Sequence, residues 1–117
     1  MKLAVPNAIL FILDPSNEAA AIPEYEALVS HSDSCVSVGT QADVDGETEV
    51  SLSFVGPSGL SLVFDGHVQT PTGSIGVMTS EGASLGSIDG LTPRTRVAVW
   101  VDDDKWPSRV AIVVSGN

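Results

Sequence analysis

The feature that most constrains this sequence is a pattern of period two near its C-terminal end. Over residues 94–102 and 108–114, alternate positions place on one side Thr95, Val97, Val99, Val101, Val110, Ile112 and Val114. This period is typical of β-strands with one buried face. Pairing Val101 with Val110 joins the strands through a loop over residues 104–107 and sets Asp102 opposite Arg109. The pattern therefore predicts an antiparallel hairpin with a cross-strand charge pair.

Shorter runs of the same kind recur upstream, separated by glycine, proline and aspartate residues that favour turns. Residues 47–55 and 59–65 are expected to pair around Pro57, because one buried face then holds Val50, Leu52, Phe54, Leu60, Leu62 and Phe64. By the same argument, a strand with Val36 and Val38 pairs with residues 47–55 through a three-residue loop over 44–46. Residues 8–13 are expected to form a buried strand.

Together these runs predict a mainly β protein, an antiparallel β-sandwich of about seven to nine short strands. One segment has helical signals, because Pro23 suits a first helical position and Glu24 and Glu26 would lie in the first turn. We therefore expect one short helix near residues 23–30. The length of 117 residues fits one β-sandwich domain over residues 1–117.

The second face of the predicted C-terminal hairpin is only half polar. It carries Arg96, Trp100, Ala111 and Val113, with Arg94 and Ala98 beside them. Apolar side chains on a strand face need a cover, which the predicted helix or another strand could provide. Alternatively, this apolar patch binds a partner, because aromatic side chains ringed by charges are typical interface anchors.

Charge limits the classes of partner. Fifteen acidic and five basic residues give a net charge of −10, which repels nucleic acid and anionic membrane surfaces. The field favours a basic protein or a cation instead. The single cysteine, Cys35, cannot form an internal disulfide, and no apolar stretch approaches the roughly 18 residues of a membrane span. These features predict a cytoplasmic protein.

The sequence contains no coherent set of catalytic residues, so we expect a protein that is not an enzyme and needs no cofactor. Residues 82–86 match the G-x-S-x-G pattern around Ser84, but both histidines, His31 and His67, precede that serine. Residues 43–49 resemble part of a calcium loop, yet Leu52 stands where the last ligand is required. A looser calcium site shared with Asp102, Asp103 and Asp104 stays open as an alternative.

Several segments carry a resemblance to a known family: residues 36–40, 45–50, 96–100 and 107–112. Their arrangement of strands and turns resembles that of small bacterial β-sandwich proteins similar to competence protein J. The resemblance covers about two thirds of the chain and rests on strand and turn patterning. That family includes acidic inhibitors of a partner nuclease, so the resemblance implies an inhibitory role, with no functional residue carried over.

Charge and resemblance favour the same hypothesis, an acidic protein-binding module. It would be an inhibitor or immunity protein that blocks a basic partner such as a nuclease or toxin, with carboxylates in place of phosphates. The acidic turns nominated for this contact hold Asp43, Asp45, Glu47, Glu49, Asp102, Asp103 and Asp104. The alternatives are a calcium- or carbohydrate-binding β-sandwich and a structural subunit of a larger assembly.

Overall fold

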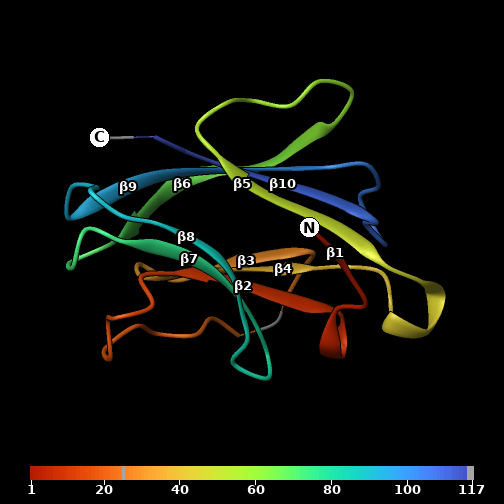
Figure 1. Cartoon of the computed structure of the whole chain (residues 1–117), viewed down its shortest axis with the longest axis horizontal. Helices are drawn as coiled ribbons and strands as arrows, with labels where there is room; N and C mark the ends of the chain where they lie inside the picture. The colour runs from red at the N-terminus through yellow and green to blue at the C-terminus, as the bar shows by residue number, and fades with distance from the viewer. Residues whose placement is uncertain (25, 116–117) are drawn as a thin grey trace.

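Two five-stranded β-sheets packed face to face make up the computed structural model, which describes residues 1–24 and 26–115 (Figure 1). The strands are β1 (Lys2–Leu3), β2 (Ile9–Leu13), β3 (Val29–His31), β4 (Cys35–Gly39), β5 (Thr48–Ser53), β6 (Ser61–Gln69), β7 (Ile75–Thr79), β8 (Ser84–Ile88), β9 (Arg94–Val101) and β10 (Arg109–Ser115). Two short 3-10 turns, η1 (Pro6–Ala8) and η2 (Asp43–Asp45), precede β2 and β5. The mainly β sandwich predicted from the sequence is confirmed.

The strand order is β1-β5-β10-β9-β6 in the first sheet and β3-β4-β2-β7-β8 in the second. The described residues form ten strands, against about seven to nine predicted, because the edge strands β1 and β3 are only two and three residues long. One pair departs from the predicted antiparallel arrangement: β5 runs parallel to β10. All other pairs are antiparallel.

The hairpin of β9 and β10 has the predicted register, with Val101 opposite Val110. The predicted charge pair across it is wrong. Arg109 Nε instead lies 3.1 Å from Glu49 Oε2 on β5, the strand parallel to β10. Asp102 accepts hydrogen bonds from the backbone N–H groups of Ser108 and Arg109, both at 3.0 Å. The sequence pattern did not predict that β5 lies parallel to β10, and this arrangement places the Glu49 carboxylate next to Arg109.

The core lies between the sheets and takes the predicted faces of several strands. The first sheet contributes Val50, Val68, Val97, Val99, Val101, Val110, Ile112 and Val114, and the second contributes Leu10, Ile12, Val36, Val38, Ile75 and Val77. Leu10 and Ile12 confirm the predicted buried strand near residues 8–13. Burial of this branched aliphatic set supplies the main favourable free energy of folding.

Two predicted hairpins are wrong. Strand β5 pairs with β1 and β10 rather than with β6, and β4 belongs to the other sheet. Two strands can bury their apolar faces in the same core either as neighbours in one sheet or as members of two facing sheets. The pattern of buried side chains therefore did not distinguish a hairpin from strands in different positions of the sandwich. Phe54 is 60% exposed, and a bulge between Leu62 and Phe64 turns Leu62 outward.

The helix predicted near residues 23–30 is also wrong for the residues that the structure describes, and Tyr25 lies outside them. Ser30 Oγ accepts hydrogen bonds from the backbone N–H groups of Glu26 and Ala27, and the Gly39 N–H donates to Leu28 O. Residues 29–31 pair with β4. Pairing with an existing strand therefore overrides the local helical signals of the sequence.

Candidate protein-binding surfaces

The two acidic turns nominated from the sequence lie next to each other at one end of the sandwich. Turn η2 and the loop between β9 and β10 stand at the right-hand end in Figure 1. The backbone N–H of Gln41 donates to Pro107 O at 2.8 Å, and the N–H of Glu49 donates to Ser108 O at 2.8 Å. We call residues 41–49 together with residues 102–109 the acidic end. Chain segments about sixty residues apart in sequence thus form one surface.

Two of its carboxylates hold the loop between β9 and β10 in shape. Asp103 Oδ1 accepts the backbone N–H groups of Lys105 and Trp106 at 2.8 and 3.1 Å, and these two bonds lower the pKa of Asp103. Asp102 accepts from the Ser108 hydroxyl at 2.6 Å and from two backbone N–H groups. Burial raises the pKa of Asp102, but these hydrogen bonds together outweigh burial and lower it. Both groups therefore carry their charge at neutral pH.

The other nominated carboxylates stand in solvent. Asp43, Asp45, Glu47 and Asp104 are exposed. In the described part of the chain, the ion pairs are Arg96 with Asp65 and Arg109 with Glu49, so none of these four has a cationic partner. The acidic end therefore separates into carboxylates that shape it and carboxylates that face outward. Lys105 lies on the same loop and offsets part of the charge.

The acidic end also holds two exposed apolar side chains that were not nominated from the sequence. Val44, at the centre of η2, is 88% exposed, and Trp106 is 68% exposed. The predicted hairpin register already placed Trp106 in the loop between the two strands. A tryptophan in a short loop between two strands predicts an exposed apolar side chain, so this position was recognisable from the sequence.

The apolar patch predicted around Trp100 lies on the outer face of the first sheet. One row across that face holds Ser51, Ala111, Trp100 and Leu62, and the next holds Ser53, Val113, Ala98 and Asp65. Ala111 is 7% exposed, and Trp100 and Val113 are half-buried. Arg96 makes a bidentate ion pair with Asp65, at 2.6 and 2.9 Å. The structure thus places all four predicted patch residues on one face.

No helix covers this face in the described residues. Instead, the connection between β5 and β6, residues 54–60, arches over its β5–β10 part (Figure 1). Pro57 and Leu60 line a cavity of about 80 Å³ together with Ala111 and Arg109. Phe54, Val55 and Leu62 stay exposed at 60, 76 and 47%. Part of the patch is therefore covered by the chain itself, and part is open.

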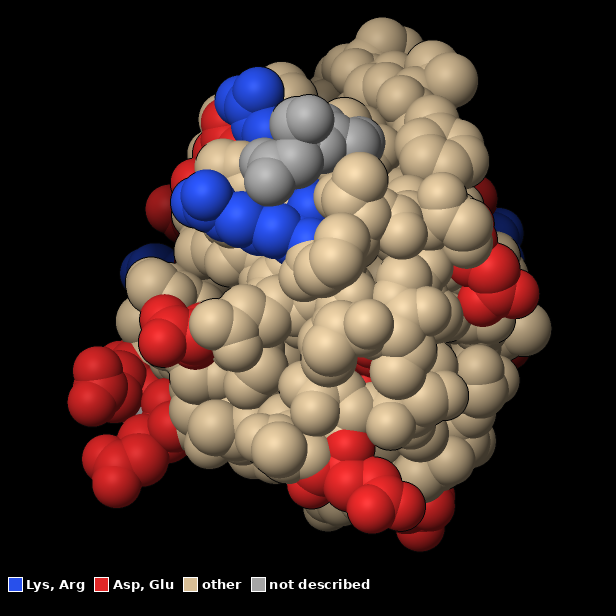
Figure 2. Space-filling model, turned by 90° about the vertical axis from the view of Figure 1, so that its left-hand side faces the viewer, with Lys and Arg blue, Asp and Glu red and all other residues tan. Residues whose placement is uncertain are grey.

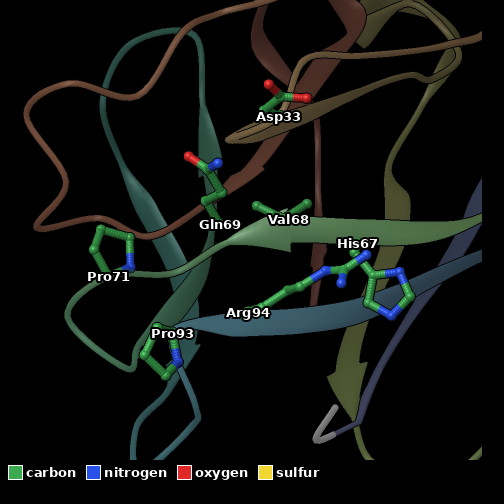
Figure 3. Close-up of a pocket in the computed structure, with 7 residues that line it drawn as sticks. All are labelled: Asp33, His67, Val68, Gln69, Pro71, Pro93 and Arg94. Atoms are coloured by element: carbon green, nitrogen blue, oxygen red, sulfur yellow. The ribbon is translucent and has the colours of Figure 1, made fainter.

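The opposite end of the sandwich has a mixed charge. Figure 2 views this end and shows a blue patch of Lys and Arg in its upper part with separate red groups to the side and below. An open pocket of about 560 Å³ lies here, lined by Asp33, His67, Val68, Gln69, Pro71, Pro93 and Arg94. Figure 3 shows the Arg94 side chain running along the sheet toward His67, with Asp33 across the pocket.

Three further observations concern chemistry and environment. Within residues 1–24 and 26–115, no three His, Cys, Asp or Glu side chains are arranged to hold a metal ion. Cys35 is a buried free thiol, and burial raises its pKa to about 11. None of the helical segments in these residues has the length and apolar character needed to cross a lipid bilayer.

Comparison with known proteins places the fold. The sequence matches no protein-family model and no curated protein. Its two facing sheets define a β-sandwich, and this sandwich is similar to the crystal structure of ComJ, an inhibitor of the DNA-degrading activity of NucA, from Bacillus subtilis. The TM-score is 0.71 over 100% of this chain and 94% of that chain, with 9% sequence identity. The predicted resemblance is confirmed as a resemblance of fold.

Proposed function

We propose that this protein binds a basic protein partner, such as a nuclease or toxin, and blocks it with the acidic end. The observation that carries this proposal is the hydrogen-bonded contact between the two acidic turns, which gathers Asp43, Asp45 and Asp104 on one surface. A nucleic-acid-cleaving enzyme needs a basic groove for phosphates. Exposed carboxylates on turns that are held by hydrogen bonds can occupy the same groove.

Charge would act mainly on the encounter between the two proteins. A net charge of −10 attracts a basic partner over distances of about one Debye length, roughly 8 Å at physiological salt. Such steering raises the association rate and suppresses wrong partners more than it adds affinity. The proposed inhibitor should therefore associate quickly at low salt and slowly at high salt.

The similarity to ComJ supports this role by analogy only. Proteins that share one fold serve many functions, so the fold alone does not assign the role. In this proposal the protein is not an enzyme, has no direct contact with nucleic acid or membrane, and acts in the cytoplasm. The unpaired thiol of Cys35 suits a reducing compartment.

The test compares three forms of the chain. The charge-reversed variant carries Asp43→Lys, Asp45→Lys and Asp104→Lys. The matched control carries Glu18→Lys, Glu24→Lys and Glu26→Lys, which makes the same change in net charge at exposed residues of the β2–β3 connection. Each form is immobilised and offered a set of purified basic nucleases and toxins, and the activity of every bound protein is then measured with the inhibitor added.

We expect the unmodified chain and the control to bind and block a common partner. The charge-reversed variant should associate at least about tenfold more slowly. Equal binding by all three forms, with no effect of salt, would contradict the acidic end as the binding surface.

A second candidate surface combines Leu62, on the open part of the apolar patch, with Phe54 and Val55 of the β5–β6 connection, and all three are exposed. Contact through this surface would suit a structural subunit of a larger assembly. Binding that is insensitive to salt but lost with Phe54→Ala and Leu62→Ala would favour it.

A further inference from the structure

We propose that Trp106, together with Val44 on the neighbouring turn to which its loop is hydrogen-bonded, is the apolar anchor of the acidic end. The partner it fits is a basic protein surface on which an apolar or aromatic side chain is flanked by Lys or Arg. This inference rests on the proposed function and deepens it. Charge brings the partner to the acidic end, and the apolar contact keeps it there.

The exposure of these two side chains is the first argument. Trp106 is 68% exposed and Val44 is 88% exposed, while the aliphatic core side chains Leu10, Ile12, Ile75 and Ile112 are fully buried. The fold thus has an apolar interior in which neither Trp106 nor Val44 takes part. Tryptophan is the residue type most enriched among the side chains that dominate binding energy at protein interfaces.

The second argument is that the backbone at Trp106 is held in place before any partner arrives. Asp103 accepts the backbone N–H groups of Lys105 and Trp106, and the next residue, Pro107, is buried. Pro107 O in turn accepts the N–H of Gln41. A loop fixed in this way loses little conformational entropy on binding, so more of the contact energy appears as affinity.

The third argument concerns the chemistry of the partner. Asp43 and Asp45 flank Val44 in the sequence, and Asp103 and Asp104 lie just before Trp106 on its loop. A purely apolar partner would strip water from these carboxylates without replacing it, which is costly. A partner with Lys or Arg around its apolar centre satisfies them, and arginine can also stack on the indole ring.

The experiment selects peptides from a random library displayed on phage. The immobilised targets are the unmodified chain, Trp106→Ala, the charge-reversed variant defined above, and Phe54→Ala. Phe54 is a matched control because it is similarly exposed, at 60%, but lies in the β5–β6 connection. Thermal unfolding checks each variant, and Trp106→Phe tests whether another aromatic ring restores binding.

We expect selected peptides to contain Lys or Arg on both sides of an apolar or aromatic residue. They should bind Trp106→Ala at least about tenfold more weakly, while Phe54→Ala leaves binding unchanged and Trp106→Phe restores most of it. Basic peptides that bind Trp106→Ala normally, or the absence of any enriched peptide, would overturn the anchor while leaving the proposed function standing. Enriched peptides that lack basic residues and bind the charge-reversed variant equally well would overturn both.

Discussion

Some carboxylates of this acidic chain stabilise the fold and others face solvent, and their hydrogen-bond partners distinguish the two groups. Asp14 is completely buried, and its oxygens accept the backbone N–H groups of Ser16 and Thr72 and the Thr72 hydroxyl. Burial raises its pKa, but the hydrogen bonds from Thr72 and Ser16 outweigh burial and lower it. Asp14 thus ties the turn after β2 to the β6–β7 connection. Asp43 and Asp45, by contrast, are exposed.

Asp14→Ala should destabilise the fold by about 2–3 kcal/mol, because it removes a charged acceptor that holds the N–H groups of Ser16 and Thr72 and the Thr72 hydroxyl. The measurement is urea unfolding at pH 7, with Asp89→Ala as the control, since exposed Asp89 accepts a single hydrogen bond from the described residues, that of the Ser74 hydroxyl. Equal losses of stability for the two variants would contradict the structural role of Asp14.

The contribution of Asp14 should also depend on pH. Its pKa is lower in the folded state, so its stabilising effect is complete above the unfolded value of about 3.9 and is lost as the pH falls through the folded value. The difference in unfolding free energy between the protein and Asp14→Asn should therefore shrink below about pH 4. A difference that grows on acidification would contradict the assigned direction of the pKa.

At the scale of elements, the β5–β6 connection is a wide arch rather than a tight hairpin turn, and of its residues only Pro57 and Leu60 line a cavity against the sheet. Gly56 and Gly59 each have open space where a side chain would begin. Insertion of four Gly and Ser residues between Pro57 and Ser58 should cost less than about 1 kcal/mol of unfolding free energy, since loop-closure entropy grows slowly with length. Thermal unfolding measures this. A loss of several kcal/mol would indicate that β5 and β6 depend on their direct connection.

The link between β6 and β7 packs much more tightly. Gly73 has a φ of +75°, and a Cβ there would lie 2.7 Å from Leu91 O, whereas Gly82 has a φ of +83° and open space. Gly82→Ala should cost about 1 kcal/mol for backbone strain alone. Gly73→Ala should cost at least about 1 kcal/mol more, because a backbone oxygen must also move. Chemical denaturation of both variants tests the difference, and equal costs would contradict the close approach.

For the whole molecule, the charges are unevenly placed. Exposed carboxylates gather at the acidic end, and Arg94 and Arg96 lie at the beginning of β9, at the opposite end. A net charge of −10 means that the folded chain repels itself, and added salt screens this repulsion. The melting temperature should therefore rise by a few degrees between low and physiological salt. A fall would indicate that the surface ion pairs outweigh the repulsion, although exposed pairs contribute only about 0–1 kcal/mol each.

The candidate site was partly visible in the sequence. The seven acidic residues stand out by composition and turn position, and Trp100, Ala111 and Val113 follow from the hairpin register. The meeting of the two acidic turns does not follow, because it depends on a parallel strand beside β10. The exposure of Trp106 follows from the same register, which places this residue in the loop between β9 and β10.

The alternation of side chains by itself determined that the chain is built of strands, and it determined the buried faces of β2, β4, β9 and β10. A period of two is a local property of extended backbone, so it can be read without neighbours. Only the tertiary structure decided which strands pair, which sheet each joins, and that residues 29–31 are a strand. Those choices depend on backbone hydrogen bonds between distant segments, and the backbone groups that make them are alike in nearly every residue.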